Sequence, residues 1–265
     1  MNRRTSTKPR AVPAPDATVA WRWREGALQP VAEPHVIRLD DLLHIDAQKQ
    51  VLVANTRQFV QRRPANHALL TGARGTGKSS LVKAALHELA SRGLRLVEVA
   101  AQALPGLHDI VRPLRARAER FILYVDDFSI AADDPGLAAL KAALDGDIEA
   151  PPENVLIYAT SNRRHLVPEF HRENEEYRWS DGELHPGESA EEKISLSERF
   201  GLWLSFPPFT QQQYLDLVAH HLRRLGVKRV TDAAREAALR WALTRASRSG
   251  RSAMQFARDW AGARR

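Results

Sequence analysis

Residues 71–80 read T-G-A-R-G-T-G-K-S-S, which fits the pattern G-x-x-x-x-G-K-[ST] of a phosphate-binding loop. Only a glycine-rich backbone lets several N–H groups turn inward and approach phosphate oxygens closely. In such a loop, Lys78 contacts the β- and γ-phosphates of a nucleotide, and the hydroxyl of Ser79 binds Mg²⁺. The residues expected to surround the phosphates are Gly72, Ala73, Arg74, Gly75, Thr76, Gly77, Lys78, Ser79 and Ser80.

Two adjacent acids, Asp126 and Asp127, follow an apolar run in the stretch F-I-L-Y-V-D-D. The run predicts a buried strand that brings both carboxylates to the carboxyl edge of a sheet, where ligands of open α/β sheets bind. We expect Asp126 to hold Mg²⁺, directly or through water, because Mg²⁺ prefers oxygen ligands. Asp127 is then positioned to orient or deprotonate an attacking water molecule. A strand that simply ends in polar residues would look the same, and what distinguishes this one is its position after the glycine loop.

Three further polar side chains stand where they can reach a bound nucleotide. Asn162 ends the predicted strand 154–162 and can approach the γ-phosphate or the water beside it, although asparagine at a strand end is also a common turn residue. Arg199 precedes a predicted strand, and Arg251 begins the last predicted helix. A guanidinium can bind two phosphate oxygens at once, but composition alone would make both residues surface arginines.

Strands and helices alternate along most of the chain. Apolar runs that predict strands lie at 67–71, 94–100, 121–127, 154–162 and 202–206. Helical patterns lie between several of these runs, so the sequence predicts an α/β fold with a parallel sheet covered by helices on both faces. The part of the chain that follows the last strand contains three helical patterns and no strand. It therefore predicts a small all-helical domain.

Composition excludes several classes of protein. The 265-residue chain has no cysteine, which rules out disulfides, thiolate metal sites and cysteine nucleophiles. Hydrophobic residues make up 43% of the chain, enough for a proper core. No apolar run reaches the roughly 20 residues that a membrane helix needs, and the N-terminus lacks the apolar region of a secretory signal. We therefore expect a cytoplasmic protein that does not contact a membrane.

Charge is distributed unevenly within the formal net charge of +7. Residues 1–30 carry six Lys or Arg against two acids, residues 240–265 carry seven Arg against one acid, and residues 169–198 carry ten acids against three bases. The basic ends are compatible with contact to nucleic acid or to an acidic partner, although solvated surface charge is the simpler interpretation. We divide the chain into a flexible basic tail (1–35), an α/β nucleotide-binding domain (36–209) with an acidic insert (169–198), and a helical domain (210–265).

The order of these motifs resembles that of an AAA+ P-loop ATPase over about residues 36–265. More narrowly, four stretches are similar to a compact, uncharacterised bacterial family of AAA+-type ATP-binding proteins. They read N-H-A-L-L-T-G-A-R-G-T-G-K-S-S-L-V-K-A, F-I-L-Y-V-D-D-F-S, Y-A-T-S-N-R-R-H-L and S-E-R-F-G-L-W-L-S-F. The first stretch is specific to P-loop proteins, and the four together carry the resemblance.

The resemblance implies a five-stranded parallel sheet of order 5-1-4-3-2, with the helical domain as a lid over bound ATP and Mg²⁺. Lys78 and Ser79 would take the Walker A roles and Asp126 the Walker B role as a magnesium ligand. Asn162 would be the sensor 1 residue. Ile45, in the segment before the glycine loop, would lie near the adenine.

Two arginines take roles by the same resemblance. Arg251 would be the sensor 2 residue, which reaches the nucleotide from the lid. Arg199 would be an arginine finger that acts on the nucleotide of a neighbouring subunit. The arginine finger implies a homo-oligomer, and an ATP-driven cycle of this kind implies a protein partner of unknown identity.

Most AAA+ proteins have glutamate at the position of Asp127. Aspartate is one methylene shorter, so its carboxylate lies about 1.5 Å back along the side chain, and a displacement of about 1 Å can slow a reaction about a hundredfold. We therefore expect an ATPase with slow hydrolysis that drives oligomer assembly or partner remodelling. One alternative is a switch that binds ATP, barely hydrolyses it and then recruits nucleic acid or protein. Another is a P-loop kinase for a small molecule.

Overall fold

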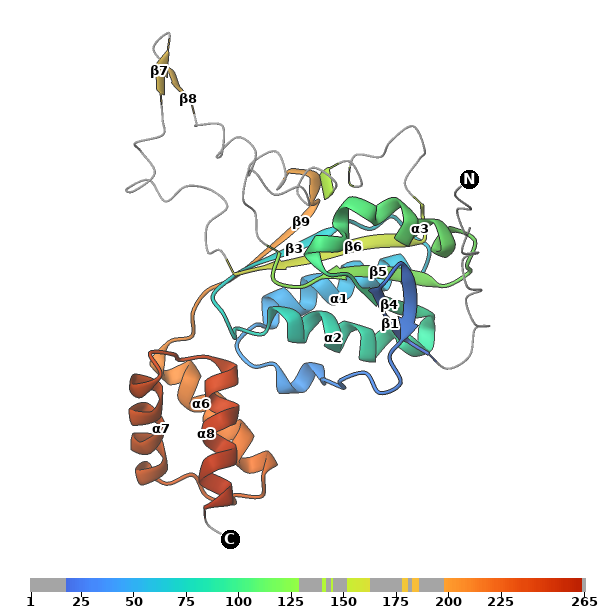
Figure 1. Ribbon diagram of the computed structural model, residues 1–265. Coiled ribbons are helices and arrows are strands. Elements are labelled where there is room, and N and C mark those ends of the chain that lie inside the picture. Colours follow the sequence, from blue (N-terminus) through green and yellow to red (C-terminus); the bar gives the residue numbers. More distant parts are fainter. Residues whose placement is uncertain are drawn as a thin grey trace, which may run out of the picture.

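The computed structural model describes residues 18–128, 140–141, 144, 152–162, 178–180, 183–185 and 198–263 (Figure 1). The strands are β1 (Ala20–Arg24), β2 (Ala27–Pro30), β3 (Ala68–Gly72), β4 (Leu94–Glu98), β5 (Arg120–Val125), β6 (Val155–Ser161), β7 (Arg178–Ser180), β8 (Glu183–His185) and β9 (Leu202–Phe206). The helices are α1 (Asp46–Val60), α2 (Lys78–Leu89), α3 (Leu107–Arg115), α6 (Gln211–Arg224), α7 (Asp232–Thr244) and α8 (Gly250–Gly262). Short 3-10 turns are η1 (Leu39–Asp41), η2 (Ala90–Arg92) and η3 (Ala101–Gly106).

The main sheet has seven strands in the order β2-β1-β4-β5-β6-β3-β9. The prediction of a five-stranded sheet with the order 5-1-4-3-2 is therefore wrong, because the sheet contains two additional strands. All pairings from β1 to β9 are parallel, and only β2 runs antiparallel, against β1. β1 and β2 extend the sheet beyond β4, while the five predicted strands lie in the order β9-β3-β6-β5-β4 within it.

The N-terminal hairpin corrects the expectation that residues 1–35 form a flexible tail. Trp21 in β1 is buried, its ring lies 6.1 Å from that of Phe121, and the guanidinium of Arg117 lies 5.2 Å from its centroid. Arg22 also donates a hydrogen bond to Glu98 of β4 at 2.7 Å. The hairpin is thus held by aromatic burial and strand pairing, whereas residues 1–17 lie outside the described residues.

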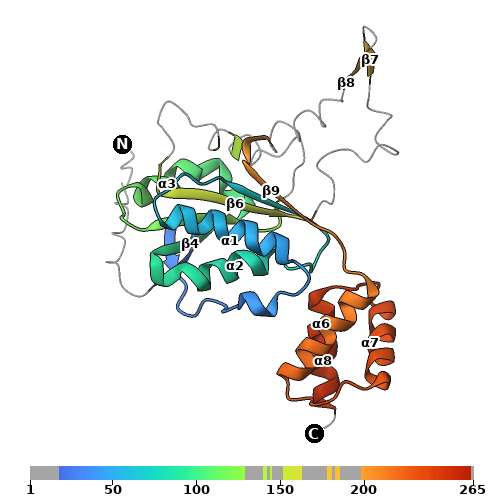
Figure 2. The same cartoon turned by 180° about the vertical axis from the view of Figure 1, so that it is seen from behind.

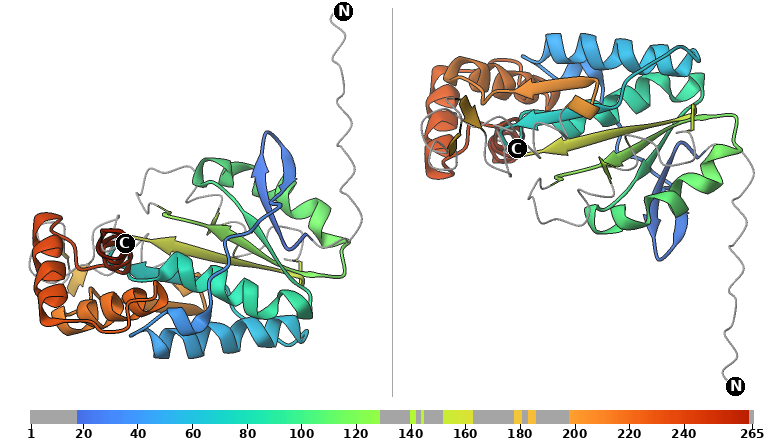
Figure 3. Two further views of the ribbon diagram at one scale, coloured as in Figure 1. Left: turned by 90° about the horizontal axis from the view of Figure 1, so that it is seen from below. Right: turned by 90° about the horizontal axis from the view of Figure 1, so that it is seen from above.

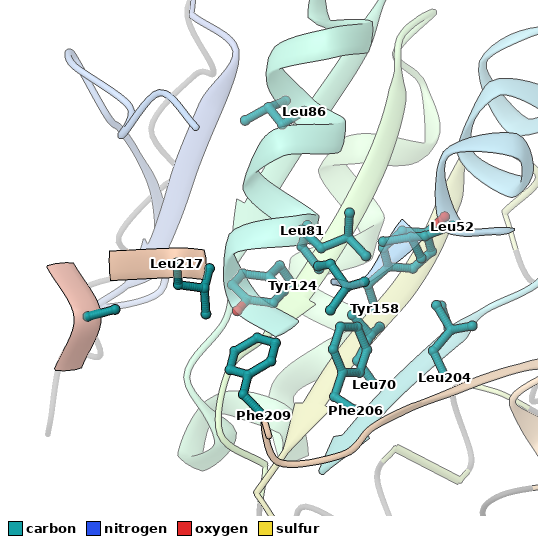
Figure 4. Packing of buried hydrophobic residues seen from close by; sticks show 14 of the residues in the cluster. Leu52, Leu70, Leu81, Leu86, Tyr124, Tyr158, Leu204, Phe206, Phe209 and Leu217 are labelled. Atoms are coloured by element: carbon teal, nitrogen blue, oxygen red, sulfur yellow. The ribbon is translucent and has the colours of Figure 1, made fainter. Parts of the chain in front are cut away.

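Helices cover both faces of the sheet, as Figures 2 and 3 show. α1 and α2 pack on one face through a core that contains Leu70, Leu81 and Tyr158 (Figure 4). α3 packs on the other face through a second core that contains Ile110 and Leu123. β5 and β6 are buried on both faces, which explains why their sequences are almost continuously apolar.

The three C-terminal helices form a separate small bundle beside the carboxyl ends of the strands (Figure 1). Thr210, Thr231 and Ser249 cap α6, α7 and α8, and each accepts a hydrogen bond from a backbone N–H of the first turn. Three side-chain pairs join α6 to the segment before α1, since Asp41 contacts Arg224 and His220, and His44 lies 3.2 Å from Asp216. The bundle therefore contacts the segment just before α1.

Two expectations fall partly outside the described residues. Within the acidic insert 169–198, the structure describes the β7–β8 hairpin and residue 198. Among the helices of the described residues, none is long and apolar enough to cross a membrane.

Candidate functional site

The glycine loop connects β3 to α2, and its backbone requires glycine. Gly72, Gly75 and Gly77 all have positive φ, at 132°, 71° and 102°. A Cβ atom at Gly72 would collide with the backbone carbonyl of Phe206 on β9. A Cβ atom at Gly75 would lie 2.7 Å from the Cβ of Ser249. The loop ends at the N-terminus of α2, whose free N–H groups and positive dipole end favour an anion.

Lys78 is the first residue of α2 and lies under the loop with 5% of its surface exposed. Its Nζ donates to the carbonyl oxygens of Gly72 and Ala73, both at 2.8 Å, and to Oδ1 of Asn162 at 3.0 Å. Burial lowers the pKa of Lys78 to about 8, although the nearby carboxylates of Asp127 and Asp126 favour the charged form. The ammonium group is thus held by acceptors that an incoming phosphate can replace.

Ser79, Asp126 and Thr160 form a cluster of oxygen atoms beside the loop. Oδ1 of Asp126 accepts hydrogen bonds from Oγ of Ser79 at 2.7 Å and from Oγ1 of Thr160 at 2.6 Å. Partial burial raises the pKa of Asp126, but the nearby hydroxyl groups of Thr160, Tyr124 and Ser79 outweigh this effect, so the pKa lies below its usual range. Asp126 is therefore ionised at neutral pH.

This cluster fits Mg²⁺. Hydroxyl and carboxylate oxygens are the ligands that Mg²⁺ prefers, and the charge of Asp126 is already held in place. Within the described part of the chain, no group of three or more His, Asp or Glu residues converges to hold a metal by itself. That agrees with a magnesium ion bound by one carboxylate, water and the phosphates of a substrate, which is how Mg²⁺ is usually held in nucleotide sites.

Asp127 and Asn162 meet at the mouth of the loop. Asp127 has a left-handed backbone with φ of 54°, and its N–H donates to Oγ1 of Thr160 at 3.0 Å. Nδ2 of Asn162 donates to Oδ1 of Asp127, while Oδ1 of Asn162 accepts from Lys78. One amide side chain thus connects the buried ammonium group to the second acid.

A cavity of about 830 Å³ lies between the loop, the segment before α1 and the helical bundle. Ile45 lines the apolar side of the cavity next to the loop. Its Cδ1 would lie 3.2 Å from a Cβ atom placed on Gly77. α8 contributes Arg251, Met254 and Arg258, which recur at helical spacing. The bundle touches the loop directly, because the N–H of Gly250 donates to the carbonyl of Gly75 at 2.8 Å.

Most of the residues predicted from sequence converge on this cavity. Its lining includes Ile45, Arg74, Gly75, Thr76, Gly77, Lys78, Ser79, Ser80, Asp126, Asp127, Asn162 and Arg251. Gly72 and Ala73 lie beneath the loop, and their carbonyl groups bind Lys78. Arg199 is half-buried just before β9 and does not line the cavity.

Sequence reasoning missed Thr160 and His221. Thr160 lies two residues before Asn162 on β6, and the period of a strand puts both side chains on one face, so this signal was present. His221 lies on α6, is buried, and lines the cavity with a pKa lowered by burial to about 4. No motif marks it, because only the packing of the helical bundle brings it to the cavity.

The fold is similar to that of solved AAA+ ATPases. RuvB of Thermotoga maritima, described as a Holliday junction branch migration motor, is 17% identical over 83% of this chain and 63% of its own, with a TM-score of 0.54. The ORC1 protein of Aeropyrum pernix, solved in complex with DNA, is 18% identical over 85% of this chain and 62% of its own, with a TM-score of 0.59. The chain thus spans less than two thirds of the length of either structure.

No curated protein matches the sequence. A family model described as "Protein of unknown function (DUF815)" matches residues 16–264, which is nearly the whole chain. The match includes the glycine loop, both acids of the β5 edge and the helical bundle. The chain therefore belongs to the DUF815 family, and its fold is that of the AAA+ P-loop ATPases.

Proposed function

We propose that the chain binds ATP with Mg²⁺ in this cavity and hydrolyses it slowly to drive oligomer assembly or the remodelling of a partner. One observation carries the proposal. The ammonium of Lys78, the Ser79–Asp126 pair and the Asn162–Asp127 pair are joined by hydrogen bonds at the N-terminus of one helix, on the wall of one cavity. This is the set of groups that phosphoryl transfer to water requires.

Each group has a defined task in this proposal. Lys78 exchanges its loop carbonyl acceptors for oxygens of the β- and γ-phosphates, and Ser79 and Asp126 bind Mg²⁺. When bound there, Mg²⁺ would supply positive charge to the phosphate oxygens. Asp127 and Asn162 orient the attacking water on the far side of the γ-phosphate. The apolar side of the cavity near Ile45 receives the adenine.

The helical bundle is proposed to act as a lid that responds to the nucleotide. Arg251 lines the cavity, and its guanidinium forms no hydrogen bond or ion pair with the side chains of the other described residues. A guanidinium in that position can bind two oxygens of the γ-phosphate and release them after hydrolysis. Because Gly250 already contacts Gly75, movement of α8 would follow directly from a change at the loop.

Arg199 supports the proposal of an oligomer. It lies outside the cavity of its own chain and near the start of the edge strand β9. We assign it as the arginine finger of a homo-oligomer, acting on the nucleotide of a neighbouring copy. A guanidinium supplied in trans typically raises the rate of phosphoryl transfer by about a thousandfold or more.

The test is ATP turnover measured against protein concentration, with Lys78→Ala as the blank. The specific rate should rise with concentration, because only assembled copies receive Arg199 from a neighbour. Arg199→Ala should remove this rise but leave nucleotide binding intact, and Arg248→Ala is a matched control on an exposed arginine that does not line the cavity. A specific rate independent of concentration, with Arg199→Ala as active as the wild type, contradicts the oligomer.

A second function is favoured by the geometry of Asp127. The short side chain of Asp127 accepts a hydrogen bond from Asn162, and its backbone is left-handed. Both features limit how far its carboxylate can move toward a water molecule. The chain would then hold ATP as a switch with little hydrolysis. If most bound ATP is released without hydrolysis, so that much less than one phosphate forms per binding event, this function is supported.

Nucleic acid is the binding partner to test for such a switch. The helical bundle from residue 211 to 263 carries ten Lys or Arg against four Asp or Glu. RuvB is described as a Holliday junction motor and ORC1 was solved with DNA, which makes DNA the first probe. Gel shifts with and without ATP at two salt concentrations should show salt-sensitive binding that depends on the nucleotide. Binding that ignores ATP would count against the switch.

A further inference from the structure

Tyr124 on β5 has a buried hydroxyl group without a hydrogen-bond partner among the described residues. Its side chain is 0% exposed. The two other fully buried tyrosines of the described residues are both bonded: Tyr158 to Asn55 and Thr56, and Tyr214 to the carbonyl of Ala238. A buried hydroxyl without a partner is unfavourable, and phenylalanine would fill the same space without this penalty. The hydroxyl of Tyr124 therefore calls for an explanation outside packing.

The position of Tyr124 puts this hydroxyl beside the magnesium cluster. Tyr124 and Asp126 are two residues apart along one strand direction, so their side chains leave the sheet on the same face. Burial raises the pKa of Tyr124, and so do the charge of Asp126 and the reach of its carboxylate to the hydroxyl, whereas the hydroxyl groups of Ser79 and Thr160 lower it. Figure 4 shows the ring below α2, next to Leu81.

The donors and acceptors around Ser79 and Asp126 show what the hydroxyl of Tyr124 could do when a cation is bound. Ser79 donates its hydroxyl hydrogen to Oδ1 of Asp126, and Thr160 donates to the same oxygen. When Ser79 uses an oxygen lone pair to bind a cation, its hydrogen still needs an acceptor. Asp126 is then also turned to the cation and is less available to accept. Tyr124 is the neighbouring group that can accept one hydrogen and donate another.

We propose that Tyr124 is a positioning residue for Mg²⁺, whose hydroxyl accepts the hydrogen of Ser79 and donates its own to Asp126 when the ion is bound. In the metal-free site this hydroxyl lies within reach of Asp126, Ser79 and Thr160 but forms no hydrogen bond of acceptable geometry, and the loaded site pairs it. The inference rests on the proposed function, since it concerns the magnesium ion that accompanies the nucleotide. It assigns to the chain a group that stabilises only the loaded state.

The experiment compares Tyr124→Phe with the wild type in nucleotide binding. Binding of a fluorescent ATP analogue is titrated with Mg²⁺, and also measured in EDTA. We expect Tyr124→Phe to raise the half-saturating Mg²⁺ concentration about three- to tenfold, the effect of losing roughly one hydrogen bond. Affinity in EDTA should stay the same. The Tm of the metal-free protein should be unchanged or higher, because the substitution removes an unpaired buried group.

Tyr158→Phe is the matched control. Tyr158 is the register partner of Tyr124 on β6 and is equally buried, but its hydroxyl is bonded to α1 rather than lying beside Asp126. This variant should lower the Tm and leave the half-saturating Mg²⁺ concentration unchanged. The two substitutions thus remove the same hydroxyl oxygen from neighbouring positions. Tyr124→Phe is expected to change the Mg²⁺ requirement, and Tyr158→Phe is expected to change the Tm.

Each outcome is decisive. If wild type and Tyr124→Phe need the same Mg²⁺ concentration, the inference is overturned while the proposed function stands. If Tyr124→Phe lowers the Tm as Tyr158→Phe does, the hydroxyl has a structural partner and the inference is also wrong. If the wild type binds the analogue without any Mg²⁺ dependence, the proposed function itself fails at the magnesium site.

Discussion

Nucleotide affinity should fall steeply above pH 8, because the binding lysine is buried. The pKa of Lys78 is lowered from 10.5 to about 8, chiefly by burial. A bound triphosphate brings negative charge to the ammonium and raises its pKa again, so the complex holds more protons than the free protein. Binding therefore takes up a proton above pH 8, and affinity decreases as pH rises through that value.

The size of the effect follows from the protonated fraction. With a pKa of about 8, about 90% of Lys78 is charged at pH 7 and about 10% at pH 9, so affinity should drop about tenfold, or about 1.4 kcal/mol. A lysine with the ordinary pKa would lose only a few per cent of its charge over the same interval. The assay is an equilibrium titration with a fluorescent ATP analogue at constant ionic strength and saturating Mg²⁺.

Lys78→Arg is the control, because a guanidinium does not titrate in this range. The variant should bind more weakly, since its geometry differs, but with a flat profile from pH 7 to 9. A wild-type affinity that stays constant up to pH 9 would refute the reasoning. So would an equal decrease in Lys78→Arg, because the titrating group would then lie elsewhere.

Three further substitutions test other parts of the site. Asp127→Glu should raise ATP turnover, measured by phosphate release, by about ten- to a hundredfold, because the longer side chain restores the reach to water; an unchanged rate contradicts slow hydrolysis by a short acid. Gly75→Ala should destabilise the fold by about 1–2 kcal/mol from its positive φ alone, and the clash with Ser249 should add to this, as urea unfolding can measure. Thr160→Val keeps the shape but removes the hydrogen bond to Asp126, so the pKa of that acid should rise from its lowered value; a Mg²⁺ titration at pH 4.5 and 7.5 should show the larger loss relative to the wild type at pH 4.5.

Local motifs predicted much of the site. Lys78, Ser79, Asp126 and Asn162 follow from short patterns, because a strand end or a loop of given composition places its side chains in a predictable way. The strands β3, β4, β5, β6 and β9 were also recognisable as apolar runs, and β3, β5 and β6 are almost continuously apolar because they are buried on both faces.

The N-terminal hairpin was missed for a physical reason. β1 has two tryptophans in alternation, but five residues form a strand in this sheet only if a strand of the main sheet accepts them as a neighbour. That neighbour is β4, and the aromatic pocket that holds Trp21 is built by Arg117 and Phe121, about a hundred residues later. A short sequence window contains neither partner.

The sequence by itself determined which side chains stand in the glycine loop and after β5, because this depends on residue type and on the local course of the backbone. Only the tertiary structure decided how the groups are connected. It brought Asn162 between Lys78 and Asp127, placed the N–H of Gly250 on Gly75, and left the hydroxyl of Tyr124 unpaired beside Asp126. Hydrogen bonds and burial between distant segments depend on ångström-scale packing, which residue types and spacing do not encode locally.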